Sequence, residues 1–125
     1  MAVNNPYAKY ATNNINSATK EELTLMLYEG ALKFTNQAIT AIESKDSAKA
    51  HDLIMRVEDI VREFQITLDY NYEISKYFDS MYDYMYRLLV DANLNKDTGP
   101  LIEVRDYLRE FRDSWKEAMK LAKNA

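Results

Sequence analysis

Histidine and cysteine, two side chains that often carry out chemistry in proteins, are nearly absent from this chain. It has one histidine, His51, and no cysteine, so thiolate metal sites, disulfides and a cysteine nucleophile are excluded. A di-iron helical bundle requires paired Glu-x-x-His motifs, and the residue three positions before His51 is Ala48. Gly30 and Gly99 are isolated, so there is no glycine-rich loop to bind phosphate. We therefore predict no catalytic residue, no bound metal and no cofactor, and do not expect an enzyme.

His51 leaves one chemical alternative open, because a lone histidine on a helical bundle can accept a phosphoryl group. Phosphotransfer domains of similar size carry the pattern His-x-Leu-Lys-Gly. Here the run is His51-Asp52-Leu53-Ile54-Met55, in which Leu53 fits but Ile54 and Met55 replace the lysine and the glycine. Met55 would crowd an approaching partner domain, so an ordinary surface histidine is the favoured interpretation.

Composition and charge exclude several further classes. The net charge is −4 and basic residues are interleaved with acidic ones, which does not resemble the footprint of a nucleic-acid-binding protein. No stretch approaches the roughly 18 consecutive apolar residues of a transmembrane helix, and the first residues lack the basic and apolar regions of a signal peptide. Together with the absence of cysteine, this predicts a cytoplasmic protein that neither binds nucleic acid nor inserts into a membrane.

Hydrophobic periodicity predicts an all-α protein, an antiparallel up-down four-helix bundle with a non-helical N-terminal arm. We expect the arm at residues 1–18 and the bundle at 19–125, with helices at about 20–44, 47–69, 73–94 and 99–122. Short connections between these segments make consecutive helices run in opposite directions.

Polar residues at the expected helix starts support these boundaries. Thr19 and Glu22 have the spacing of a capping box. Asp46 or Ser47 can cap the second helix. Thr98 is expected to cap the fourth helix, which has a proline in its first turn.

Tyrosine and methionine are unusually frequent, at 10 and 6 residues. The segment Met81-Tyr82-Asp83-Tyr84-Met85-Tyr86 is aromatic or methionine nearly all round, whereas a bundle helix needs only about a third of its circumference for the core. One interpretation is that a tight, small bundle buries a wide apolar stripe. The other is an exposed groove that receives another chain and that the arm, through Tyr7 and Tyr10, covers in the free protein.

Four runs, in order and spread over nearly the whole chain, resemble the FliS family of flagellin export chaperones. They are Asn5-Pro6-Tyr7-Ala8-Lys9-Tyr10; Glu22-Leu23-Thr24-Leu25-Met26-Leu27-Tyr28-Glu29-Gly30-Ala31; Met81-Tyr82-Asp83-Tyr84-Met85-Tyr86-Arg87-Leu88 with Ala92-Asn93; and Phe111-Arg112-Asp113-Ser114-Trp115-Lys116. The second matches the family pattern Glu-Leu-x-x-Met-Leu-Tyr-x-Gly-Ala. Any one run would be a weak signal, and the four together are specific.

The chain departs from the family pattern at two places. Many members have paired arginines where this chain has Arg87-Leu88. Many also have Gly-Gly before the third helix, where this chain has Asn71-Tyr72, which suggests a stiffer connection.

The resemblance implies a chaperone that binds the C-terminal segment of flagellin, prevents premature polymerisation and presents flagellin to a component of the flagellar export gate. The candidate contact residues are Tyr7, Tyr10, Ile54, Val57, Val61, Tyr82, Met85 and Leu89. Periodicity does not separate those that face a client from those that face the core. A generic helical adaptor or oligomerisation bundle is the alternative, and wide apolar stripes also leave a homodimer open.

Overall fold

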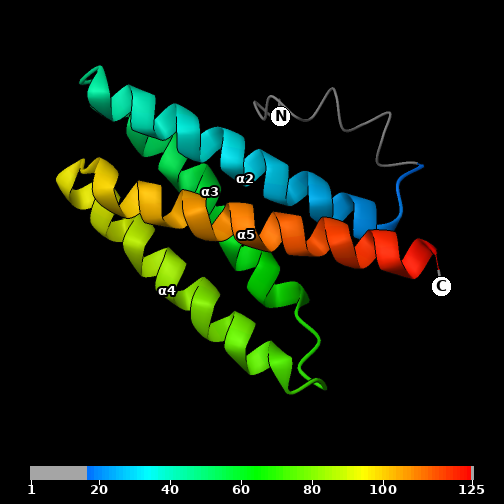
Figure 1. Cartoon of the computed structure of the whole chain (residues 1–125). Coiled ribbons are helices and arrows are strands. Elements are labelled where there is room, and N and C mark those ends of the chain that lie inside the picture. Colours follow the sequence, from blue (N-terminus) through cyan, green and yellow to red (C-terminus); the bar gives the residue numbers. More distant parts are fainter. Residues whose placement is uncertain (1–16, 125) are drawn as a thin grey trace, which may run out of the picture.

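Four helices make up most of the part of the chain that the computed structural model describes, residues 17–124. They are α2 (Lys20–Glu43), α3 (Ser47–Thr67), α4 (Ile74–Asn95) and α5 (Thr98–Lys123). Each helix packs against two others, in the closed order α2, α3, α4, α5, and consecutive helices run in opposite directions (Figure 1). The predicted all-α four-helix bundle is confirmed. The predicted arm falls almost entirely on residues 1–16, which lie outside the described part.

Side-chain caps begin three of the helices. The Thr19 hydroxyl accepts from the Glu22 amide at 3.1 Å and the Glu22 carboxylate accepts from the Thr19 amide at 2.8 Å, which confirms the capping box. Asp46 caps α3 by accepting from the Lys49 amide at 3.2 Å. The prediction for α5 was wrong by one residue, because Asp97, and not Thr98, is the cap. A carboxylate near the positive end of a helix dipole is a stronger acceptor than a hydroxyl.

The two ends of the bundle differ in how tightly they are connected. Very short turns join α2 to α3 and α4 to α5, and each contains a lysine in the left-handed backbone conformation, Lys45 with φ 61° and Lys96 with φ 48°. The connection between α3 and α4, residues 68–73, is longer. Figure 1 shows the consequence: the helices meet closely at the short-turn end, and α4 diverges from α5 towards its own start. The bundle is therefore open at one end.

The core is formed by apolar stripes from all four helices. Its fully buried large side chains include Ile54, Val57 and Val61 from α3, Met85 and Leu89 from α4, and Leu101, Val104 and Leu108 from α5. The smaller Ala31 and Ala38 of α2 are also at 0% exposure, and small residues at a helix interface let the backbones approach closely. Within the described residues, no helix combines the length and the apolar character needed to cross a membrane.

One carboxylate lies inside this core. Glu58 of α3 is 6% exposed, and burial raises the pKa of its carboxyl, while a hydrogen bond to Tyr86 acts in the opposite direction. A carboxyl whose pKa is higher in the folded than in the unfolded chain opposes folding at a pH above its unfolded pKa of about 4.3. Below that pH the group is protonated in both states and the penalty disappears.

We therefore expect Glu58→Gln to raise the free energy of unfolding at pH 7 and to leave it nearly unchanged at pH 3.5. The amide has the shape of the protonated carboxyl and does not ionise. Urea unfolding of both proteins at the two pH values measures the effect. A difference of the same size at pH 7 and pH 3.5 would show that the charge is not the cause.

Candidate functional site

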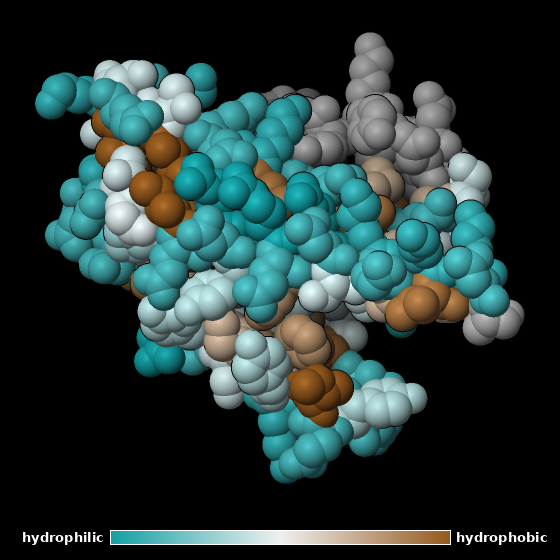
Figure 2. Space-filling view, viewed as in Figure 1, coloured by the Kyte–Doolittle hydropathy of each residue, from teal (hydrophilic) through white to brown (hydrophobic). Residues whose placement is uncertain are grey.

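A cavity of about 560 Å³ occupies the open end of the bundle. It lies between the connection after α3, the first half of α4 and the C-terminal half of α5. Its lining residues are Tyr28, Leu68, Asp69, Tyr72, Ile74, Ser75, Tyr77, Phe78, Tyr82, Glu110, Phe111, Ser114, Trp115 and Ala118. Figure 2 shows a hollow under α5, with apolar atoms gathered over the start of α4. We call this cavity the furrow.

Stacked aromatic rings form the floor of the furrow. The ring centroids of Tyr28 and Phe64 are 4.4 Å apart, and those of Phe64 and Tyr82 are 5.3 Å apart. Phe111 meets Tyr82 edge-on at 5.9 Å and Phe78 edge-on at 5.4 Å. Aromatic pairs in such geometries contribute about 0.5–1.5 kcal/mol each beyond the area they bury. The floor is therefore a rigid extension of the core.

Two hydroxyls are buried in this floor and pair with each other. The oxygens of Tyr28 and Tyr82 lie 2.7 Å apart, and the two residues are 4% and 3% exposed. Burial raises the pKa of both phenols. Both groups are therefore neutral at physiological pH, and one hydroxyl donates a hydrogen bond to the other in an apolar environment.

The wall on the α4 side is apolar and exposed. Tyr72 is 65% exposed, Ile74 60% and Tyr77 50%. They are exposed because α4 diverges from α5 here, so no helix of the bundle covers this face. Large apolar side chains grouped at the rim of a cavity are typical of a site that binds another polypeptide.

The opposite wall belongs to α5 and is tied to the start of α2. The indole N–H of Trp115, which is half-buried, donates to the backbone carbonyl of Glu21 at 3.0 Å. Glu110 and Ser114 on the same helix add polar groups to this side. The furrow thus has an apolar floor, one apolar wall and one mixed wall.

The structure shows which of the helical contact candidates are accessible. Ile54, Val57, Val61, Tyr82, Met85 and Leu89 are 0–3% exposed and belong to the core. Each lies on the side of α3 or α4 that faces the other helices, so the apolar stripe that marked them is the stripe that folding uses. Among these six only Tyr82 lines the furrow. Tyr7 and Tyr10 lie outside the described residues.

The exposed wall residues were missed as contact candidates. Ile74 and Tyr77 fall at helical spacing with Phe78 and Met81 in the third predicted helix, 73–94, and Tyr72 falls in the connection before it. One feature of the sequence could have indicated that these three residues are exposed. They lie in or beside the longest connection, where a helix can extend past its neighbours. The segment 81–86, which stood out in the sequence, is buried or half-buried except for Asp83.

Two further features concern chemistry, namely the side chains that can bind a metal and the position of His51. In residues 17–124, no group of three or more histidine, aspartate or glutamate side chains is placed to hold a metal ion. His51 is exposed, its Nδ1 lies 2.9 Å from the Asn93 side-chain nitrogen, and it does not line the furrow. The furrow offers apolar area and hydroxyls, with the carboxylates of Asp69 and Glu110 also in its lining, and this arrangement suits the apolar face of an amphipathic helix.

The tyrosine pair of the floor leads to a test by double substitution. Tyr28→Phe or Tyr82→Phe alone leaves one buried hydroxyl without its partner, so each is expected to cost about 1–3 kcal/mol of stability. The double variant removes both hydroxyls and should be clearly more stable than the sum of the two losses predicts. Denaturant unfolding of the four proteins gives the coupling free energy. Strictly additive losses would contradict a direct bond.

Comparison with known proteins assigns the chain to a family. The family model described as flagellar protein FliS matches residues 3–122. The flagellar secretion chaperone FliS of Bacillus subtilis (strain 168) is 48% identical over 119 residues, covering 95% of this chain and 90% of the relative. That of Campylobacter jejuni is 30% identical, covering 94% and 93%, and that of Escherichia coli (strain K12) is 27% identical, covering 82% and 78%. The chain therefore belongs to the FliS family of flagellar secretion chaperones.

Proposed function

We propose that the chain is a cytoplasmic chaperone that binds the C-terminal segment of flagellin in the furrow. Binding there keeps flagellin from polymerising before export, and the chaperone delivers it to the flagellar export apparatus. The observation that carries this proposal is the wall of Tyr72, Ile74 and Tyr77, which stands exposed at 50–65% above an aromatic floor.

The size of the furrow suits anchor side chains of a longer segment. A volume of about 560 Å³ is that of a pocket for a group of side chains, and not for an entire helix. An amphipathic helix laid along α4 and α5 would insert its apolar residues between Ile74 and Trp115. The tyrosine hydroxyls at the rim remain in contact with water while their rings bury apolar area.

Binding of this kind also explains how a chaperone can release its client without chemical energy. A client segment that is disordered when free must be ordered on binding, at a cost of about 2–5 kcal/mol or more. This cost keeps the complex dissociable despite a large apolar contact. Release then requires only a competing contact, which we assign to a component of the export gate.

The remaining contact candidates take supporting roles in this proposal. Tyr82 contributes to the floor, and the five other buried helical residues hold α3 and α4 in place behind it. Tyr7 and Tyr10 belong to the arm, which we propose covers the furrow until a client displaces it.

The proposal is tested by titrating a flagellin C-terminal peptide in a calorimeter. We expect a negative heat-capacity change, because apolar surface is buried. Ile74→Ser should raise the dissociation constant about tenfold, since burying an isoleucine contributes about 1.5–3 kcal/mol when complete. The melting temperature should change little, because Ile74 is 60% exposed in the free protein.

Leu94→Ser is the matched control. Leu94 is 79% exposed on the same helix and does not line the furrow, so this variant should bind the peptide like the unchanged protein. Equal weakening in the two variants would show that binding does not occur in the furrow. If no peptide binds and light scattering shows a dimer that Ile74→Ser dissociates, the furrow is an interface between two copies of the chain.

A further inference from the structure

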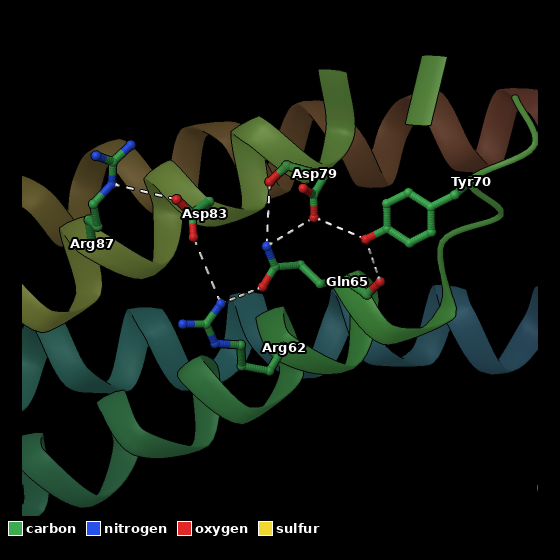
Figure 3. Close-up of polar contacts among 6 residues, drawn as sticks. All are labelled: Arg62, Gln65, Tyr70, Asp79, Asp83 and Arg87. Atoms are coloured by element: carbon green, nitrogen blue, oxygen red, sulfur yellow. Dashed lines mark hydrogen bonds and ion pairs between the residues drawn. The ribbon is translucent and has the colours of Figure 1, made fainter. Parts of the chain in front are cut away.

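A network of polar side chains joins α3, the α3–α4 connection and α4 on the side of α4 that faces α3 (Figure 3). It consists of Arg62 and Gln65 from α3, Tyr70 from the connection, and Asp79, Asp83 and Arg87 from α4. We call this network the α3–α4 latch. None of its six residues lines the furrow.

Asp79 is the centre of the latch. The Tyr70 hydroxyl lies 3.0 Å from Asp79 Oδ1 and 3.1 Å from the Gln65 backbone carbonyl oxygen. Its proton is therefore shared between an acceptor on α4 and an acceptor on α3. The Gln65 side-chain amide lies 3.3 Å from the same Oδ1 and 3.4 Å from the Asp79 carbonyl. Hydrogen bonds to a carboxylate are stronger than those between neutral groups. Side chains of α3 and of the α3–α4 connection therefore converge on one carboxylate of α4.

Two arginines extend the latch along the helices. Arg62 donates to Gln65 Oε1 at 2.6 Å, and its guanidinium carbon lies 3.6 Å from the ring centroid of Tyr86. Asp83 pairs with both Arg62 and Arg87 at 3.9 Å. These two ion pairs are exposed and long, so they contribute little. The contacts at Asp79 are 3.0–3.4 Å long and Asp79 is half-buried, while Tyr70 is 58% exposed, so we expect these shorter contacts to be the stronger part.

The start of α4 has few other attachments. Among residues 74–81 only Ser75 is buried, and Glu73 caps the helix without a side-chain hydrogen bond. Phe78 packs against the aromatic floor, and α4 diverges from α5 at this end. A helix start with little buried area opens locally at low cost unless another contact restrains it.

We infer that Tyr70 and Asp79 are positioning residues of the furrow. They tie the α3–α4 connection and the first turns of α4 to α3, and thereby fix the wall that carries Tyr72, Ile74 and Tyr77. A wall held in place before the client arrives saves the cost of ordering it on binding. The effect on client affinity rests on the proposed function, whereas the position of the wall is a property of the free protein.

Hydrogen exchange of the free protein tests the positioning directly. Tyr70→Phe and Asp79→Ala should each speed the exchange of backbone amides 75–81 about tenfold, as expected when a hydrogen bond to a charged group is lost. Alanine is the better helix former, so faster exchange in Asp79→Ala would not come from helix propensity. Lys76→Gln is the control. It breaks an exposed ion pair of 3.5 Å between Lys76 and Glu73, which lies at the same helix start but does not belong to the latch.

The flagellin C-terminal peptide then links the latch to binding. We expect its dissociation constant to rise threefold or more in Tyr70→Phe and Asp79→Ala, and to stay unchanged in Lys76→Gln. If neither latch variant exchanges its amides faster, the inference is overturned. The proposed function still stands in that case, provided that the protein without substitutions binds the peptide. Faster exchange in the latch variants, with unchanged exchange in Lys76→Gln, supports the inference whether or not the peptide binds. If neither the unchanged protein nor any variant binds the peptide, only the proposed function is overturned.

Discussion

The divergence of α4 from α5 is the constraint on which the other features of this protein depend. Short turns hold the helices together at one end, with Lys45 and Lys96 in left-handed conformations. The longer connection at the other end, residues 68–73, lets the axis of α4 diverge from that of α5. Large aromatic rings fill the inner part of this end and leave the outer part as the furrow. The proposed binding site is therefore the unfilled end of the core.

Because the furrow is continuous with the core, some residues serve both folding and the proposed binding. Tyr82 stacks in the core, bonds to Tyr28 and lines the furrow, so a polar substitution there would damage the fold and the site together. Tyr72, Ile74 and Tyr77 contribute little to the core and present their apolar area outward. A substitution in the exposed wall is therefore expected to change stability little, whereas the floor is constrained by folding.

The two departures from the usual FliS pattern fall next to the proposed site and its latch. Where many members have Gly-Gly before the third helix, this chain has Asn71-Tyr72, and Tyr72 forms part of the wall. Where many have two arginines, Arg87 pairs with Asp83 at 3.9 Å while Leu88 packs against the core. A stiffer connection with a large side chain is consistent with a wall held in place by Tyr70 and Asp79.

From the sequence alone, the four helices, the Thr19 capping box and the likeness to FliS could be predicted, because helix capping and helical periodicity depend on residues that are close together in the sequence. The site could not. Ile54 and Ile74 are equally apolar members of predicted stripes, yet one is 0% and the other 60% exposed. An apolar stripe records which side chains avoid water but not whether another helix lies opposite. That depends on how far α4 diverges from α5, which is decided by packing between residues distant in the chain.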